Sequence, residues 1–189
     1  MTKRNPGYMS NRLNRLIQSY SSYISIPWMK GLADEQRVLF AVYHKEDELK
    51  LRARTEEFRL ATENAGHTWL ELDITRMFPE WMAEQKYRED YFEDPEFLKS
   101  KYKVFVRQSV ELLAERIQDE ADENTLVALV GCGTLFGLAS VSDFVKQLAL
   151  HVPGRLLVLF PGEYVDNTYR LLDARDGWGY QATAITAEN

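Results

Sequence analysis

The sequence has little of what secreted, metal-binding and membrane proteins depend on. One cysteine occurs in 189 residues, which rules out a disulfide framework within the chain, and the three histidines, His44, His67 and His151, lack metal-ligand spacing. No apolar run approaches the roughly 18 residues that cross a bilayer. We therefore expect a cytoplasmic protein with no bound metal and no membrane attachment.

Charge is distributed unevenly along the chain. The net charge is −6 at pH 7, yet the first 33 residues contain no acid. Acids concentrate in the run Glu80–Glu96, which contains seven acidic residues and two basic ones, Lys86 and Arg88. Affinity for the DNA backbone comes mainly from Lys and Arg, so an acidic chain is a poor general DNA binder. Direct DNA contact is therefore not expected. Arg12 and Arg15 lie in the short basic N-terminal segment and are the residues through which such contact would be possible.

The C-terminal half contains the clearest structural pattern. Leu126–Val130 and Leu156–Phe160 are short apolar runs, and apolar residues recur at helical spacing across Val141–Ala149 between them. This pattern predicts a βαβ unit with parallel, buried strands and a right-handed crossover. Ser140 or Ser142 can cap the helix.

Similar patterns place the other elements. Arg37–Tyr43 and Thr68–Asp73 read as strands, and the alternation in the second predicts one partly exposed face. Long helices are expected from Glu46 to about Ala65, and from the Asp94-Pro95 cap to about Asp119.

Both ends of the chain are expected to pack on this unit. A helix containing Leu13–Tyr20 follows a frayed start at residues 1–8 and caps the sheet or docks a partner. Near the C-terminus, strands at Thr168–Leu172 and Tyr180–Ile185 flank Asp176-Gly177, which suggests a hairpin. The expected fold is thus one α/β domain over residues 1–189, a three-layer αβα arrangement. Its sheet is mostly parallel with room for an antiparallel C-terminal edge hairpin, and residues 1–30 form a basic helical extension packed on it.

The loop Gly131–Gly137 invites a phosphate-binding interpretation because glycines let backbone amides approach an anion. However, Leu138 and Ala139 stand where a P-loop requires its lysine and hydroxyl residue, so ATP or GTP binding is not expected. The alternatives are a degenerate anion site and a tight strand-to-helix connection. Gly133 and Gly162 are predicted to turn the chain at positive φ after buried strands.

Catalytic constellations are sparse, and no catalytic residue is assigned. Cys132 has no histidine nearby in the sequence. Asp73 and Glu163 follow or end strands and could share an edge for acid/base or magnesium chemistry, but ion pairs with Arg170 and Arg175 are the favoured explanation for most such acids.

Aromatic residues among charges offer two further readings. Tyr87, Tyr91 and Phe92 interleave with acids, a pattern that fits helix packing or an interface. Trp178 and its neighbouring charges fit a partner surface, or a ring that anchors the turn to the core. The candidates for a ligand or partner surface are Gly131, Gly133, Thr134, Glu163, Arg170, Arg175, Asp176 and Trp178.

Three blocks, Val130–Gly137, Leu159–Glu163 and Tyr169–Tyr180, resemble those of the BrxB family of BREX bacteriophage-defence systems. The strand at Val38–Tyr43 followed by Glu46–Leu49 also fits that family. The resemblance implies a bacterial cytoplasmic protein acting beside a methyltransferase, a large ATPase and the alkaline-phosphatase-like protein PglZ. It implies no catalytic residues and no cofactor. The expected function is therefore an adaptor, most plausibly for the PglZ-like component, needed for phage restriction and host DNA methylation. The alternative is a nucleotide- or metal-dependent enzyme or switch that uses the Gly131–Gly137 loop with Asp73 or Glu163.

Overall fold

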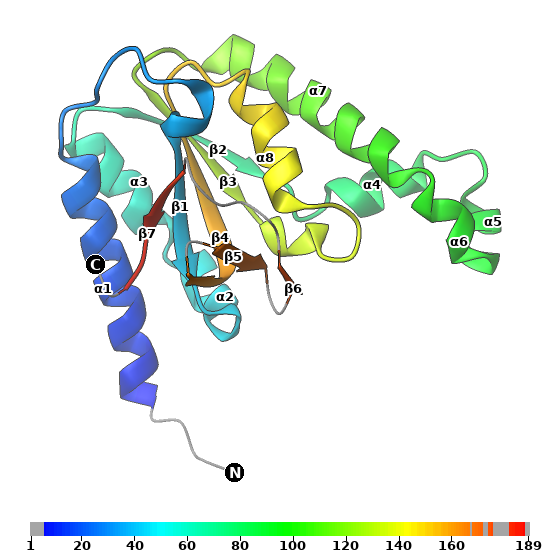
Figure 1. Cartoon of the computed structure of the whole chain (residues 1–189), viewed down its shortest axis with the longest axis horizontal. Coiled ribbons are helices and arrows are strands. Elements are labelled where there is room, and N and C mark those ends of the chain that lie inside the picture. Colours follow the sequence, from blue (N-terminus) through cyan, green and yellow to red (C-terminus); the bar gives the residue numbers. More distant parts are fainter. Residues whose placement is uncertain (1–5, 167, 172–173, 176–181, 188–189) are drawn as a thin grey trace.

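A mostly parallel sheet forms the centre of the molecule (Figure 1). The computed structural model describes residues 6–166, 168–171, 174–175 and 182–187. The parallel strands are β1 (Val38–Tyr43), β2 (Thr68–Asp73), β3 (Thr125–Val130), the first part of β4 (Arg155–Val165), and β7 (Thr183–Ile185). Their order across the sheet is β2-β3-β4-β1-β7. The predicted parallel pairing of β3 with β4 is confirmed.

Burial follows position in the sheet. Every residue of β1 and β3 is buried, as expected for central strands covered on both faces. The edge strand β2 exposes Thr68, Glu71 and Asp73, which confirms the partly covered face that its alternation predicts.

Helices cover both faces, so the predicted three-layer αβα fold is confirmed. On one face lie α1 (Pro6–Ile24), α2 (Glu48–Arg52) and α3 (Thr55–Asn64), which pack on alternate strand residues such as Leu39 and Leu157. The other face carries α7 (Tyr102–Glu120) and α8 (Val141–Ala149), packed on Phe40, Val127 and Val158 among others. Ser140 caps α8 through its hydroxyl, which accepts from the Asp143 amide. No helix in the described part of the chain combines the length and apolarity needed to span a bilayer.

The antiparallel part of the sheet differs from the predicted hairpin. The eleven-residue β4 continues past the parallel sheet and pairs with β5 (Thr168–Leu171), which pairs in turn with β6 (Ala174–Arg175). Asp166, directly after β4, has φ 49, a left-handed conformation that Asp tolerates better than most residues. The C-terminal strand β7 instead runs parallel to β1, because its Ile185 joins the apolar layer with α1. Asp176-Gly177 lies outside the described residues.

Three predicted helices have different bounds. Helix α1 begins at Pro6 rather than after residue 8, since proline is well tolerated in a helix's first turn. The helix expected from Glu46 to Ala65 is divided by Arg54, whose φ of −123 is not helical, and Gly66, with φ 87, follows the C-terminal cap residue Ala65. The helix expected from Asp94 is also divided, into α6 (Pro95–Lys99) and α7, although Asp94 does cap α6.

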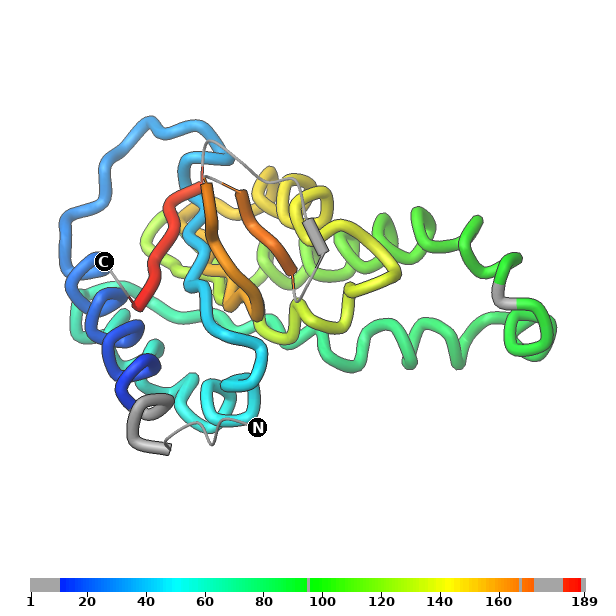
Figure 2. The backbone as a smooth tube through the Cα atoms, turned by 60° about the horizontal axis from the view of Figure 1, so that its bottom comes forward, coloured from blue at the N-terminus to red at the C-terminus, as the bar shows by residue number. Residues whose placement is uncertain are grey.

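A helical arm projects from one side of the sheet (Figures 1 and 2). We define it as residues 77–108, which comprise α4 (Met77–Ala83), α5 (Arg88–Glu93), α6 and the beginning of α7. Figure 2 shows α5 and α6 at the end farthest from the sheet. We call residues 87–99 the tip of the arm.

Candidate functional site

Polar side chains from α2, the helix that follows β1, and from the end of β2 meet at the carboxyl edge of the sheet, where open α/β sheets usually bind ligands. Arg52 donates to Thr75 Oγ1 at 2.6 Å, and its Nη1 lies 3.6 Å from Asp73 Oδ2. Asp73 Oδ1 accepts from the Thr75 amide at 2.9 Å and also from the Thr75 hydroxyl. Asp73, the sequence candidate for metal or acid/base chemistry, is therefore held by an arginine and a threonine.

A second carboxylate extends this network toward the core. Glu48 accepts from Arg52 Nε at 2.6 Å and from the Tyr43 hydroxyl. Burial raises the pKa of Tyr43, and the hydrogen bond to Glu48 raises it further. Partial burial lowers the pKa of Arg52, but its contacts with Glu48 and Asp73 outweigh that effect, so this pKa is raised. Tyr43 therefore stays protonated and Arg52 charged near neutral pH.

The Gly131 loop closes on the same network. Gly131 has φ 87, and a Cβ there would collide with Thr75 Oγ1. The loop then forms a 3-10 turn in which the amide of Thr134 donates to Gly131 O at 3.0 Å and that of Phe136 to Gly133 O at 3.2 Å. The Thr134 hydroxyl donates to Thr75 O at 3.4 Å. Since two loop amides bond within the loop and Gly131 packs on Thr75, this geometry favours the tight strand-to-helix connection over an anion cradle.

The sequence interpretation chose the wrong glycines for positive φ. Gly131 has this conformation, whereas Gly133 and Gly162 do not. A Cβ on Gly133 would make only an ordinary 3.5 Å contact with Pro161. Gly162 is constrained for another reason, because a Cβ there would collide with the backbone carbonyl of Arg170 on β5.

We expect Gly131→Ala to lower the free energy of unfolding by about 1–3 kcal/mol, because it combines a strained conformation with a steric collision. The matched variant Gly133→Ala should change it by less than about 0.5 kcal/mol. Urea denaturation of both variants measures the difference. Equal losses would show that the conformation of Gly131 is not the cause.

Three other candidates lie in one row across the antiparallel strands. Glu163 on β4 is opposite Arg170 on β5, and Arg170 is opposite Arg175 on β6. Glu163 and Arg170 are exposed, and opposite charges on facing strand positions stabilise pairing modestly. Asp176 and Trp178 lie outside the described residues, so their role at a partner surface stays a prediction.

The two arginines proposed for DNA contact occupy different environments on α1. Arg12 donates from Nη2 to Oδ2 of the buried Asp47 at 2.8 Å. The positive charge of Arg12 is therefore paired with a carboxylate inside the protein. Arg15 is exposed and lines a hollow of about 710 Å³ between α1 and β7. Helix α1 covers the sheet with Leu13, Leu16 and Tyr20, which fits the sheet-capping alternative.

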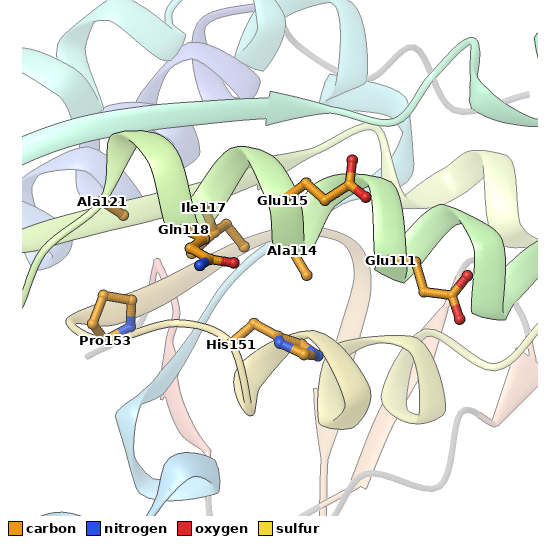
Figure 3. A pocket seen from close by; sticks show the side chains of 8 residues that line it. All are labelled: Glu111, Ala114, Glu115, Ile117, Gln118, Ala121, His151 and Pro153. Carbon is orange, nitrogen blue, oxygen red and sulfur yellow. The ribbon is translucent and has the colours of Figure 1, made fainter.

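A shallow hollow of about 600 Å³ lies between α7 and the loop after α8 (Figure 3). It is lined by His151 and by Glu111 and Glu115, but Figure 3 shows the Glu115 carboxylate pointing away from the imidazole. Among the residues that the structure describes, no three His, Cys, Asp or Glu side chains are grouped to hold a metal ion. This hollow does not bring reactive groups together.

The arm carries surface residues that the sequence interpretation only partly identified. Tyr91 is buried, whereas Tyr87, Phe92 and Phe97 expose 55%, 66% and 62% of their surface. The interleaved aromatics thus divide between packing and exposure, and the exposed set also includes Phe97. Its only sequence signal is that an aromatic residue directly follows Glu96, the last acid of the run.

Comparison with protein-family models, with curated proteins and with solved structures finds no match to this chain.

Proposed function

We propose that this protein is a non-catalytic component of a BREX anti-phage defence complex. In this role it acts as an adaptor that docks the PglZ-like component and supports phage restriction and host DNA methylation. The resemblance of the blocks Val130–Gly137, Leu159–Glu163 and Tyr169–Tyr180 to the BrxB family supports the assignment to BREX. The observation that carries the adaptor role is the helical arm with its exposed aromatic tip.

The base of the arm is well packed. Phe78 and Trp81 on α4 meet Phe105 on α7 edge-to-face, with ring centroids 5.2 and 5.5 Å apart. Trp81 Nε1 also donates to Gln108 Oε1 at 2.7 Å. Such aromatic pairs add about 0.5–1.5 kcal/mol each beyond the burial of their area. The base can therefore hold the tip in a defined position, which reduces the entropy lost when a partner binds.

The tip has the composition of an interface. Phe92 and Phe97 make no ring contact with another described residue, and both are more than half exposed. Acids surround them, and of these Asp90 and Glu93 are exposed without an ion-pair partner in the described part of the chain. Aromatic anchors within a charged rim are typical of interface hot spots.

The charge of the arm indicates what the partner's surface must carry. The run Glu80–Glu96 has seven acids against two bases, so a complementary surface on the partner carries arginine or lysine around an apolar pocket. We propose that the PglZ-like component supplies it. Because exposed charges are screened by salt, the complex should form more slowly at high ionic strength.

Copurification tests the adaptor role. The tagged protein is expressed with each other protein of its BREX system in turn, and we expect the PglZ-like component to remain bound through size-exclusion chromatography. A tag on an unrelated protein of similar charge is the control. Retention of none of the BREX proteins, singly or together, would contradict the proposal.

A further inference from the structure

A pocket of about 720 Å³ lies at the amino edge of the sheet, opposite the Gly131 loop. The segment between α1 and β1 crosses the amino ends of the strands there (Figure 1). The lining includes residues of that segment, Trp28 and Lys30 among them, together with Arg37, Glu123 and the first residue of β4, Arg155. None of these residues belongs to the arm or to the loop network described above.

Arg155 is a buried cation without a counter-ion. It is 7% exposed, and no carboxylate among the described residues lies within ion-pair distance of it. Its Nη2 donates to the Met29 carbonyl at 3.3 Å, and its guanidinium carbon lies 5.5 Å from the centre of the Trp28 ring. Trp28 stacks on His67 with ring centroids 3.8 Å apart, which fixes the surface on which the guanidinium rests.

The surroundings make this charge costly. Burial has the largest effect on the pKa of Arg155 and lowers it, Tyr23 raises this pKa by a smaller amount, and the nearby Arg37 lowers it by the smallest amount. Lys30, Arg37 and Arg155 line the pocket, Glu123 is the acid among its lining residues, and Arg37 is paired with Asp34 beside it. This local excess of positive charge occurs on a chain of net charge −6. An unpaired buried charge is strongly destabilising unless something binds to it.

Arg155 lines the pocket and keeps donors that solvent can reach. The buried nitrogens without a partner in the described residues belong to Arg12 and Arg37, so the remaining N–H groups of Arg155 stay in contact with solvent. A guanidinium presents a planar fork that binds carboxylate or phosphate through two parallel hydrogen bonds. The volume of the pocket is within the range of small-molecule sites.

We infer that this pocket binds a small-molecule oxyanion, a carboxylate or a phosphate, on the guanidinium of Arg155. The exposed Lys30 adds a second positive charge at the mouth. A small ligand fits better than a polymer, because Arg155 is too deeply recessed for the backbone of a duplex to reach it. The inference does not depend on the adaptor role, and either can hold without the other.

Melting temperature in a buffer free of both anions tests the site. Sodium phosphate and sodium citrate are titrated separately, with sodium chloride at matched ionic strength as the control. We expect a saturable rise with one of the two anions, about 5 °C or more at about 100 times its dissociation constant, which chloride does not reproduce. The anion that acts identifies the ligand chemistry. A response equal to that of chloride with both anions would overturn the inference.

Variants locate the response. Arg155→Met should abolish the rise while leaving the melting temperature in anion-free buffer unchanged or higher, because it removes an unpaired buried charge. Arg76→Met, on an arginine that is 83% exposed, should keep the full response. A rise that persists in Arg155→Met would contradict the assignment.

Milder changes cover the case in which Arg155→Met fails to fold. Lys30→Ala should weaken binding of the active anion at least about threefold, because it removes a positive charge near the site. Glu123→Gln should strengthen binding, because it removes a negative charge that repels the anion. Unchanged affinity in both variants would exclude this pocket as the binding site.

Discussion

Replacing Phe92 and Phe97 together with serine is expected to lower affinity for the PglZ-like component at least about 100-fold. Each ring exposes more than 60% of its surface, so its removal leaves no cavity and the melting temperature should change little. Interface hot spots cost about 2 kcal/mol or more each, and every 1.4 kcal/mol is about a tenfold change in the dissociation constant. Titration calorimetry with the purified partner measures the loss.

Two control variants separate the arm from other surfaces. Leu150→Ser removes a side chain that is 66% exposed at the end of α8, and affinity should be unchanged. Phe136→Ala removes a 47% exposed ring from the Gly131 loop and tests the surface that the sequence first suggested. If Phe136→Ala abolishes binding and the double arm variant does not, the docking surface lies at the carboxyl edge of the sheet.

Arg12→Met is expected to destabilise the fold by about 3–5 kcal/mol, the largest stability effect that we predict. Asp47 is 1% exposed and its Oδ2 accepts from Arg12 at 2.8 Å. Removing Arg12 leaves this carboxylate buried, and among the described residues its remaining ion-pair partner is Lys50, 3.8 Å from Oδ1. At about 2–4 °C per kcal/mol for a chain of this size, the melting temperature should fall by roughly 10 °C.

The other arginine of α1 provides the matched control for Arg12. Arg15→Met changes an exposed residue on the same helix and should alter stability by less than about 0.5 kcal/mol. The double variant Arg12→Met/Asp47→Leu should recover much of the loss, since an apolar pair can replace a buried ion pair. A normally stable Arg12→Met protein that loses DNA binding would contradict this account and support the DNA-contact hypothesis.

The sequence predicts the central elements of this fold well because each has a strong local signal. The apolar runs of β1, β3 and β4 are short and bounded by glycine or polar residues, which favours buried strands over helices, and Ser140 caps α8 by its own side chain. Strand pairing is less local. β7 pairs with β1 rather than β5 because Ile185 packs in the apolar layer with α1. The sequence around β7 does not show this distant contact.

The candidate site was harder to predict for the same reason. Tyr91 and Phe92 are adjacent and chemically alike, yet one is buried and the other exposed, because only the packing of the arm distinguishes them. Gly131 and Gly133 differ in their neighbours, because a Cβ on Gly131 would meet Thr75 and a Cβ on Gly133 would meet Pro161. Thr75 follows a different strand, so the local sequence does not show this contact. Arg155 has one local signal in the sequence, because it is a charged residue at the start of an otherwise apolar run, and the first part of β4 is buried throughout.

Hydrogen–deuterium exchange of the protein, free and bound to the PglZ-like component, tests the arm as the docking surface most directly. Amide exchange reports protection along the whole chain in one measurement. We expect new protection at residues 87–99, with little change at residues 131–137 and 163–171. Protection at those two segments with an unchanged arm tip would contradict the account and move the interface to the Gly131 loop and the antiparallel strands.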